Sequence, residues 1–176
     1  MKFSLITCIN KKFAIGKNGE LLYHIPNDMQ NFRTMTTNNV VIMGRKTFES
    51  LPNKKPLPNR INIVITSQED WGVEGNYDNL FVVNSVETAV NFCEAYYSDK
   101  ECFVIGGSML YDQFYELDLL DTMYITVVND EADGDVYFPR DIFDDERWYT
   151  FYSSYTQRHR PTELTYKFMI LKFNKN

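Results

Sequence analysis

Two basic side chains and a hydroxyl follow a short apolar segment directly, in Gly44-Arg45-Lys46-Thr47. Free backbone N–H groups and the helix dipole favour an anion at the start of a helix. The added positive charge strengthens that preference. We therefore predict a phosphate-binding site here, with the hydroxyl groups of Thr66 and Ser67 as further donors. The segment lacks the GxxxxGKS spacing of a P-loop.

A second candidate for phosphate binding is Gly106-Gly107-Ser108, which follows another apolar segment and precedes a predicted helix. Because glycine has no Cβ atom, the backbone can approach a diphosphate closely at such a place. A tight turn without a ligand is the alternative interpretation. The GxGxxG fingerprint of common dinucleotide-binding folds is absent.

Asp28 is the candidate for acid–base chemistry. It follows Pro26, which favours the first turn of a helix, and Phe32 and Met35 fall near it on the same helical face. Apolar surface beside a carboxylate raises its pKa, because burial disfavours the charged form. Such a group could bind an amidine-like heterocycle and share a proton with it. The alternative is that the acid serves only the helix dipole.

Composition narrows the classes of function. The chain has 176 residues, of which 44% are hydrophobic and 15% aromatic, and its net charge is −6. This aromatic content excludes intrinsic disorder, and the negative charge argues against nucleic-acid binding. No apolar run has the length of a membrane-spanning helix, so we predict no membrane partner.

The histidines and cysteines predict no metal site. His24 and His159 are far apart in the sequence, and neither has a cysteine or an acid at the spacing of metal ligands. Cys8, Cys93 and Cys102 contain no CxxC pair. Three buried, apolar and reduced thiols in the cytoplasm are the expected state of these cysteines.

The elements that position these groups follow from alternating apolar and helical segments. Strands are predicted over residues 3–9, 40–43, 61–65, 80–83, 103–105 and 123–128, and helices over 26–36, 45–51, 85–97 and 108–115. Residues 11–25, 52–60 and 66–79 are predicted loops, and 148–157 with 164–173 an antiparallel hairpin. We predict a single α/β domain over residues 1–176, with a mostly parallel central sheet, an antiparallel C-terminal edge hairpin and flanking helices.

Several motifs together resemble the dihydrofolate reductase family, in the family's order and over nearly the whole chain. They are residues 15–19, 25–28, 41–50, 57–60, 104–107 and 133–135, followed by Phe138-Pro139. The resemblance implies the dihydrofolate reductase-like fold and an oxidoreductase of one-carbon metabolism and tetrahydrofolate biosynthesis. Such an enzyme reduces 7,8-dihydrofolate to 5,6,7,8-tetrahydrofolate with NADPH. We further expect a cytoplasmic monomer that binds antifolate inhibitors.

The resemblance also assigns the substrate pocket. It implies that Asp28 is the only carboxylate there, that it hydrogen-bonds the 2-amino group and N3 of the pteridine, and that it supports protonation of N5. Arg60 matches the arginine that holds the glutamate α-carboxylate. Tyr23 stands where the family often has a tryptophan that helps hold an ordered water. The implied catalytic residues are Asp28, Tyr23 and Thr126, and the other substrate contacts are Ile6, Phe32, Leu51, Leu57, Ile105 and Tyr111.

On the cofactor side, Arg45, Thr66 and Ser67 match positions at the adenosine 2′-phosphate, and Lys46 and Thr47 match the diphosphate contacts. Gly106-Gly107 matches a pair joined by a cis peptide bond. Residues 14–20 match a mobile loop over the nicotinamide, which Asp135 steadies. The other implied cofactor contacts are Cys8, Ile15, Gly16, Asn18, Gly44, Ser108 and Met109.

Two other functions remain open at this point. One is a related NADPH-dependent reductase of another pterin or pyrimidine, and the other is a ligand-binding regulator with little turnover. Asp28 and Arg60 together favour a folate, because a substrate without a glutamate tail needs no clamp.

Overall fold

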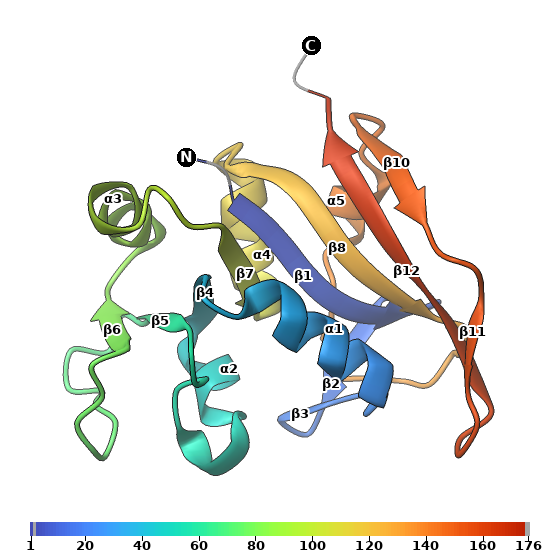
Figure 1. Cartoon of the computed structure of the whole chain (residues 1–176), viewed down its shortest axis with the longest axis horizontal. Coiled ribbons are helices and arrows are strands. Elements are labelled where there is room, and N and C mark those ends of the chain that lie inside the picture. The colour runs from blue at the N-terminus through green and yellow to red at the C-terminus, as the bar shows by residue number, and fades with distance from the viewer. Residues whose placement is uncertain (2, 175–176) are drawn as a thin grey trace.

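A large mixed sheet runs through the molecule (Figure 1). The structure is a computed structural model, which describes residue 1 and residues 3–174. The parallel strands are β1 (Phe3–Asn10), β4 (Val40–Gly44), β5 (Ile61–Ile65), β6 (Leu80–Val83), β7 (Cys102–Gly106) and β8 (Leu120–Val128). Antiparallel to β8 lies β12 (Leu164–Phe173), which pairs with β10 (Trp148–Ser153) and β11 (Gln157–His159). The strand order is β10-β12-β8-β1-β7-β4-β5-β6. The predicted parallel sheet with an antiparallel C-terminal edge is therefore confirmed.

Helices cover both faces of this sheet. Alternate residues of a strand point to opposite faces, so each face has apolar side chains that a helix can bury. Val41 and Met43 pack on the face that carries α1 (Pro26–Thr36) and α2 (Arg45–Glu49). Ile42 packs on the other face, with α3 (Val86–Tyr96), α4 (Ser108–Glu116) and α5 (Arg140–Asp144). Figure 1 shows α1 in front of the sheet and α4 behind it. Burial on both sides explains why β4 is apolar throughout.

The segment 11–25, predicted as a loop, instead contains strands. β2 (Ala14–Lys17) pairs with β3 (Glu20–Leu21) and with β9 (Val136–Tyr137) in a second sheet. Asn18 and Gly19 form the turn between β2 and β3, both with positive φ. An Asn-Gly pair is a hairpin signal. The strands are too short to show periodicity, and β9 comes from a distant part of the sequence.

The C-terminal hairpin and the short helices also differ in detail from the prediction. β10 ends at Ser153 and β11 begins only at Gln157, after an irregularity in pairing between Thr150 and Tyr152. The helix predicted to run to residue 51 ends at Glu49 and is followed by the 3-10 turn η1 (Pro52–Lys54). Helix α5 was not predicted, because its few apolar residues give no helical pattern.

The cysteines are free thiols, as predicted. Cys93 and Cys102 are buried as expected, whereas Cys8 is partly exposed, because it faces the cavity described below. Among the described residues, no group of histidine, cysteine and acidic side chains is arranged to hold a metal ion. In the same part of the chain, no helix is long and apolar enough to cross a membrane.

Candidate active site

A cavity of about 1190 Å³ lies on the α1 and α2 face of the sheet. Its wall comes from β1, α1, the segment after α2, β7, β8 and β12, which are far apart in the sequence. The cavity brings together every residue predicted for catalysis or substrate binding: Ile6, Tyr23, Asp28, Phe32, Leu51, Leu57, Arg60, Ile105, Tyr111 and Thr126.

Asp28 lies in the first turn of α1, which begins at Pro26 as predicted. The hydroxyl Oγ1 of Thr126 donates a hydrogen bond of 2.5 Å to Asp28 Oδ1. Burial raises the pKa of Asp28, and hydrogen bonds from Thr126 and Cys8 oppose that rise in pKa. The register of β1 and β8 places Cys8 opposite Thr126, so both donors reach the carboxylate from neighbouring strands. The result is a fixed carboxyl group that takes up a proton more readily than an exposed one.

A second carboxylate corrects the expectation that Asp28 stands alone. Glu20, in β3, also lines the cavity. Its side chain is exposed at the surface, whereas Asp28 is half-buried. Asp28 therefore has the desolvated surroundings that raise the pKa of a carboxylate.

Tyr23 is buried in the cavity wall, and its hydroxyl is engaged on two sides. It accepts a hydrogen bond of 2.9 Å from Asn10 Nδ2 and donates one of 2.6 Å to Asp130 Oδ2. Burial, with Asp130 adding to the effect, raises the pKa of Tyr23. These bonds attach the segment before α1 to the ends of β1 and β8, a role that the sequence did not indicate.

Arg60 is a buried cation, with 7% of its surface exposed. Its Nε donates to the carbonyl of Pro58 at 2.9 Å, and its Nη1 donates to Thr36 Oγ1 at 3.3 Å. Burial, and to a lesser degree the nearby Arg33, lowers the pKa of Arg60. Within the described part of the chain, no carboxylate forms an ion pair with this guanidinium. Its remaining N–H groups are therefore suited to a carboxylate of the ligand.

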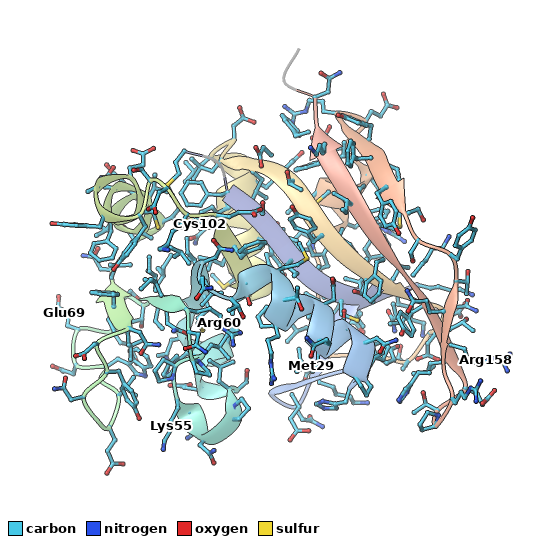
Figure 2. All side chains as sticks on the ribbon, in the orientation of Figure 1. Met29, Lys55, Arg60, Glu69, Cys102 and Arg158 are labelled. Carbon is cyan, nitrogen blue, oxygen red and sulfur yellow. The ribbon has the colours of Figure 1, made fainter. Side chains whose placement is uncertain are left out.

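Further cations and apolar residues of the cavity were missed by the sequence analysis. Arg33 and Lys55 also line it, and Figure 2 shows Lys55 and Arg60 on the side of α1 that faces α2. Phe168 and Ile170 contribute from β12. The basic residues before Pro56 were a usable signal for Lys55, whereas nothing local marks β12, because it reaches the cavity only through sheet pairing.

The two glycine junctions lie against each other. The Gly106–Gly107 peptide bond is cis, and Gly106 has a φ of 129° that favours glycine. A Cβ atom at Gly106 would stand 3.3 Å from Thr47 Oγ1, and one at Gly44 would stand 3.8 Å from the Gly107 nitrogen. Side chains there would fill the space between β4 and β7, so this cradle fits a ligand held by backbone and small side chains.

The predicted phosphate ligands come from neighbouring strand ends. Pairing of Gly44 with Ile65 puts Arg45 beside Thr66. Lys46 and Ser67 are exposed. Of the predicted cofactor residues, Cys8, Ile15 and Thr47 line the large cavity, and Gly16, Asn18, Gly44, Arg45, Lys46, Thr66, Ser67, Gly106, Gly107, Ser108 and Met109 lie outside its wall.

The loop at residues 14–20 is attached to Asp135, as the resemblance implied. Asn18 N donates to Asp135 Oδ2 at 2.8 Å, and Asp135 N donates to the Gly16 carbonyl at 3.0 Å. Ser108 Oγ donates to the Tyr137 carbonyl at 2.6 Å, which links the start of α4 to β9. The second sheet thus connects the loop with the glycine junction.

Comparisons with known proteins agree on one family. The sequence matches the family described as dihydrofolate reductase over residues 2–173. It is 36% identical over 167 residues to the dihydrofolate reductase of Bacillus subtilis (strain 168), covering 95% of this chain and 92% of that protein. The enzyme of the same name from Staphylococcus aureus (strain Mu50) is 36% identical over 145 residues, 82% of each chain. A solved structure of dihydrofolate reductase from Enterococcus faecalis, complexed with NADP(H) and RAB-propyl, superposes with a TM-score of 0.85 at 27% identity and covers 99% of this chain and 97% of that one.

Proposed function

The chain belongs to the dihydrofolate reductase family, and we propose how its own residues carry out the reduction of 7,8-dihydrofolate to 5,6,7,8-tetrahydrofolate with NADPH. It is thus an NADPH-dependent oxidoreductase of tetrahydrofolate biosynthesis. Asp28 binds the pteridine and supports protonation of N5, and Arg60 holds the carboxylate of the glutamate tail.

The observation that carries this proposal is the presence of a half-buried acid and a buried cation in the same cavity. Asp28 is hydrogen-bonded to Thr126, and Arg60 has no carboxylate partner among the described residues. A folate has a ring with an amidine-like edge at one end and a carboxylate at the other. The cavity therefore offers each end of the substrate a group of opposite character.

Asp28 acts by binding and by sharing a proton. Its carboxylate accepts hydrogen bonds from N3 and the 2-amino group, and its raised pKa favours proton exchange with that edge of the ring. Thr126 keeps the carboxylate in position. N5 is remote from this edge, so water delivers its proton. NADPH, when bound, supplies the hydride that reduces C6.

The cofactor is held by the adjacent junctions at the ends of β4, β5 and β7. The cradle between Gly44, Thr47 and Gly106-Gly107 would receive the diphosphate. Lys46 adds a positive charge there, while Arg45, Thr66 and Ser67 bind the 2′-phosphate. This arrangement favours NADPH over NADH, because hydrogen bonds to a charged group are stronger than neutral ones.

We also propose that residues 1–176 work as one domain, in a cytoplasmic monomer that binds antifolate inhibitors in the same cavity. Free thiols support a reducing compartment.

The test is a turnover assay that follows loss of NADPH absorbance with two substrates, dihydrofolate and a dihydropterin that lacks the glutamate tail. We expect a kcat/KM for dihydrofolate about tenfold or more above that for the tail-less substrate, because only dihydrofolate engages Arg60. Equal efficiency with both would indicate a reductase of pterins in general. Tight binding of dihydrofolate without turnover would indicate a regulator instead.

A further inference from the structure

Glu49 connects the proposed 2′-phosphate site to a separate loop. Its Oε1 atom accepts a hydrogen bond of 3.1 Å from Arg45 Nη1, one helical turn earlier. The same oxygen accepts a hydrogen bond of 3.1 Å from Trp71 Nε1. Arg45 and Glu49 are each about one-third exposed. A single carboxylate thus holds a cation of α2 and a side chain from the loop between β5 and β6.

Trp71 fixes that loop against α2. Its ring meets the buried Phe48 edge-on, with ring centroids 5.6 Å apart. The loop, residues 66–79, begins with Thr66 and Ser67, directly after β5. Long loops without regular structure need such anchors, since ordering them costs conformational entropy. The position of Trp71 therefore affects the same loop that carries the two hydroxyl ligands.

Arg45 keeps most of its donor capacity in this arrangement. A guanidinium has several N–H groups in a planar fork, and only Nη1 bonds to Glu49. Because Glu49 follows Arg45 by one turn of the helix, it restricts the rotamers of the arginine without occupying the whole fork. The free N–H groups remain available to a phosphate.

We propose that Glu49 and Trp71 are positioning residues for recognition of the 2′-phosphate. Glu49 orients Arg45, and Trp71 ties the 66–79 loop to the same carboxylate. Arg45, Thr66 and Ser67 thereby form one preassembled phosphate-binding unit. This inference rests on the proposed function, which assigns the 2′-phosphate to those three residues.

The first test replaces the indole by a smaller aromatic ring without an N–H donor, with Trp71→Phe, and measures the Kd of NADPH and of NADH. NADPH binding is expected to weaken about three- to tenfold and NADH binding by less than about twofold, as for loss of one hydrogen bond. Glu49→Gln, which keeps the oxygen acceptor but removes the charge, should weaken NADPH binding in the same selective way. Trp148→Phe, a tryptophan that packs on Phe173 away from this site, is the matched control and should change neither Kd.

A second test uses fluorescence. The chain has two tryptophans, so Trp148→Phe leaves Trp71 as the only one. Its emission should change on titration with adenosine 2′-phosphate, and not with adenosine 5′-phosphate at the same concentration. An identical response to both probes would contradict the proposal.

The outcomes separate this inference from the function on which it rests. Arg45→Ala should reduce the preference for NADPH whatever Glu49 and Trp71 do. If Arg45→Ala weakens binding of NADPH and NADH equally, the assignment of the 2′-phosphate to Arg45 is itself wrong. If Arg45→Ala is selective but Trp71→Phe weakens both cofactors equally or neither, or if Glu49→Gln tightens NADPH, then only the positioning role is wrong.

Discussion

Asp28 and Arg45 both lie in the first turn of a helix, but they differ in burial and in the charges around them. Asp28 is enclosed by the cavity, and burial raises its pKa. Arg45 is about one-third exposed and paired with Glu49. The helix dipole favours the acid at its place and disfavours the cation, so the glutamate at i+4 offsets an unfavourable position for Arg45.

The difference follows from what each ligand part requires. A phosphate keeps its charge throughout the reaction, so an exposed cation and backbone donors suffice to bind it. The pteridine must gain a proton, and a carboxylate assists only when its surroundings shift its proton affinity toward the working pH. Substitution of a buried charge should therefore reduce activity or ligand binding more than substitution of an exposed charge. The following substitutions test that ranking.

The largest effect is expected for Arg60→Leu. Loss of a bidentate contact between charged groups is worth about 2–4 kcal/mol, so the KM for dihydrofolate should rise roughly 30- to 1000-fold. The kcat/KM for a tail-less dihydropterin should be almost unchanged in this variant, and this comparison controls for misfolding. Arg158→Leu serves as matched control, since Arg158 is an exposed arginine paired with Glu163. An equal loss for both substrates would mean that Arg60 does not read the tail.

Asp28→Asn comes next. The kcat at neutral pH should fall about 100-fold or more, the range for loss of an acid–base group, and should recover at low pH, where solvent protonates the substrate. Steady-state kinetics across pH provide the measurement. Glu20→Gln changes the exposed carboxylate of the same cavity and should leave the rate within about twofold. If the two variants behave alike, burial is not what distinguishes these acids.

Arg45→Ala should have a smaller effect, confined to cofactor choice. NADPH should bind about 10- to 100-fold more weakly, because one or two charge-assisted hydrogen bonds are lost. NADH should bind nearly as before. The measurement is the Kd of each cofactor. Arg140→Ala, which changes an exposed arginine of α5, is the control. A loss larger than that for Arg60→Leu would reverse the ranking of buried and exposed charges.

The smallest effect concerns stability. Because burial raises the pKa of Asp28, the folded state binds more protons than the unfolded state between the two pKa values. This stabilisation is complete below the unfolded pKa and is lost as pH rises through the folded pKa. The stability of Asp28→Asn relative to the unmodified protein should therefore increase as pH rises through the folded pKa of Asp28. Urea unfolding of the ligand-free proteins at several pH values would reveal it, and a gap independent of pH would contradict it.

The comparison also explains which parts of the proposed site can be found from local sequence patterns. The phosphate region is local: Gly44 to Thr47 form a strand end and a helix start, and Gly106-Gly107 repeats the pattern. Such junctions are visible in a few consecutive residues. The substrate cavity is assembled from distant segments, and its residues were named mainly through the family resemblance. Its cations Arg33 and Lys55 were missed altogether.

The sequence by itself determined the succession of apolar strands and helices along the chain, the start of α1 at Pro26 and the glycine junctions. These features depend on interactions among near neighbours. Only the tertiary structure decided the partners of Tyr23, the burial of Arg60 and the sharing of Glu49 by Arg45 and Trp71. Each of these depends on segments that meet only when the sheet has formed. Local residue patterns do not encode such distances, since hydrogen bonding and desolvation depend on which side chains packing brings together.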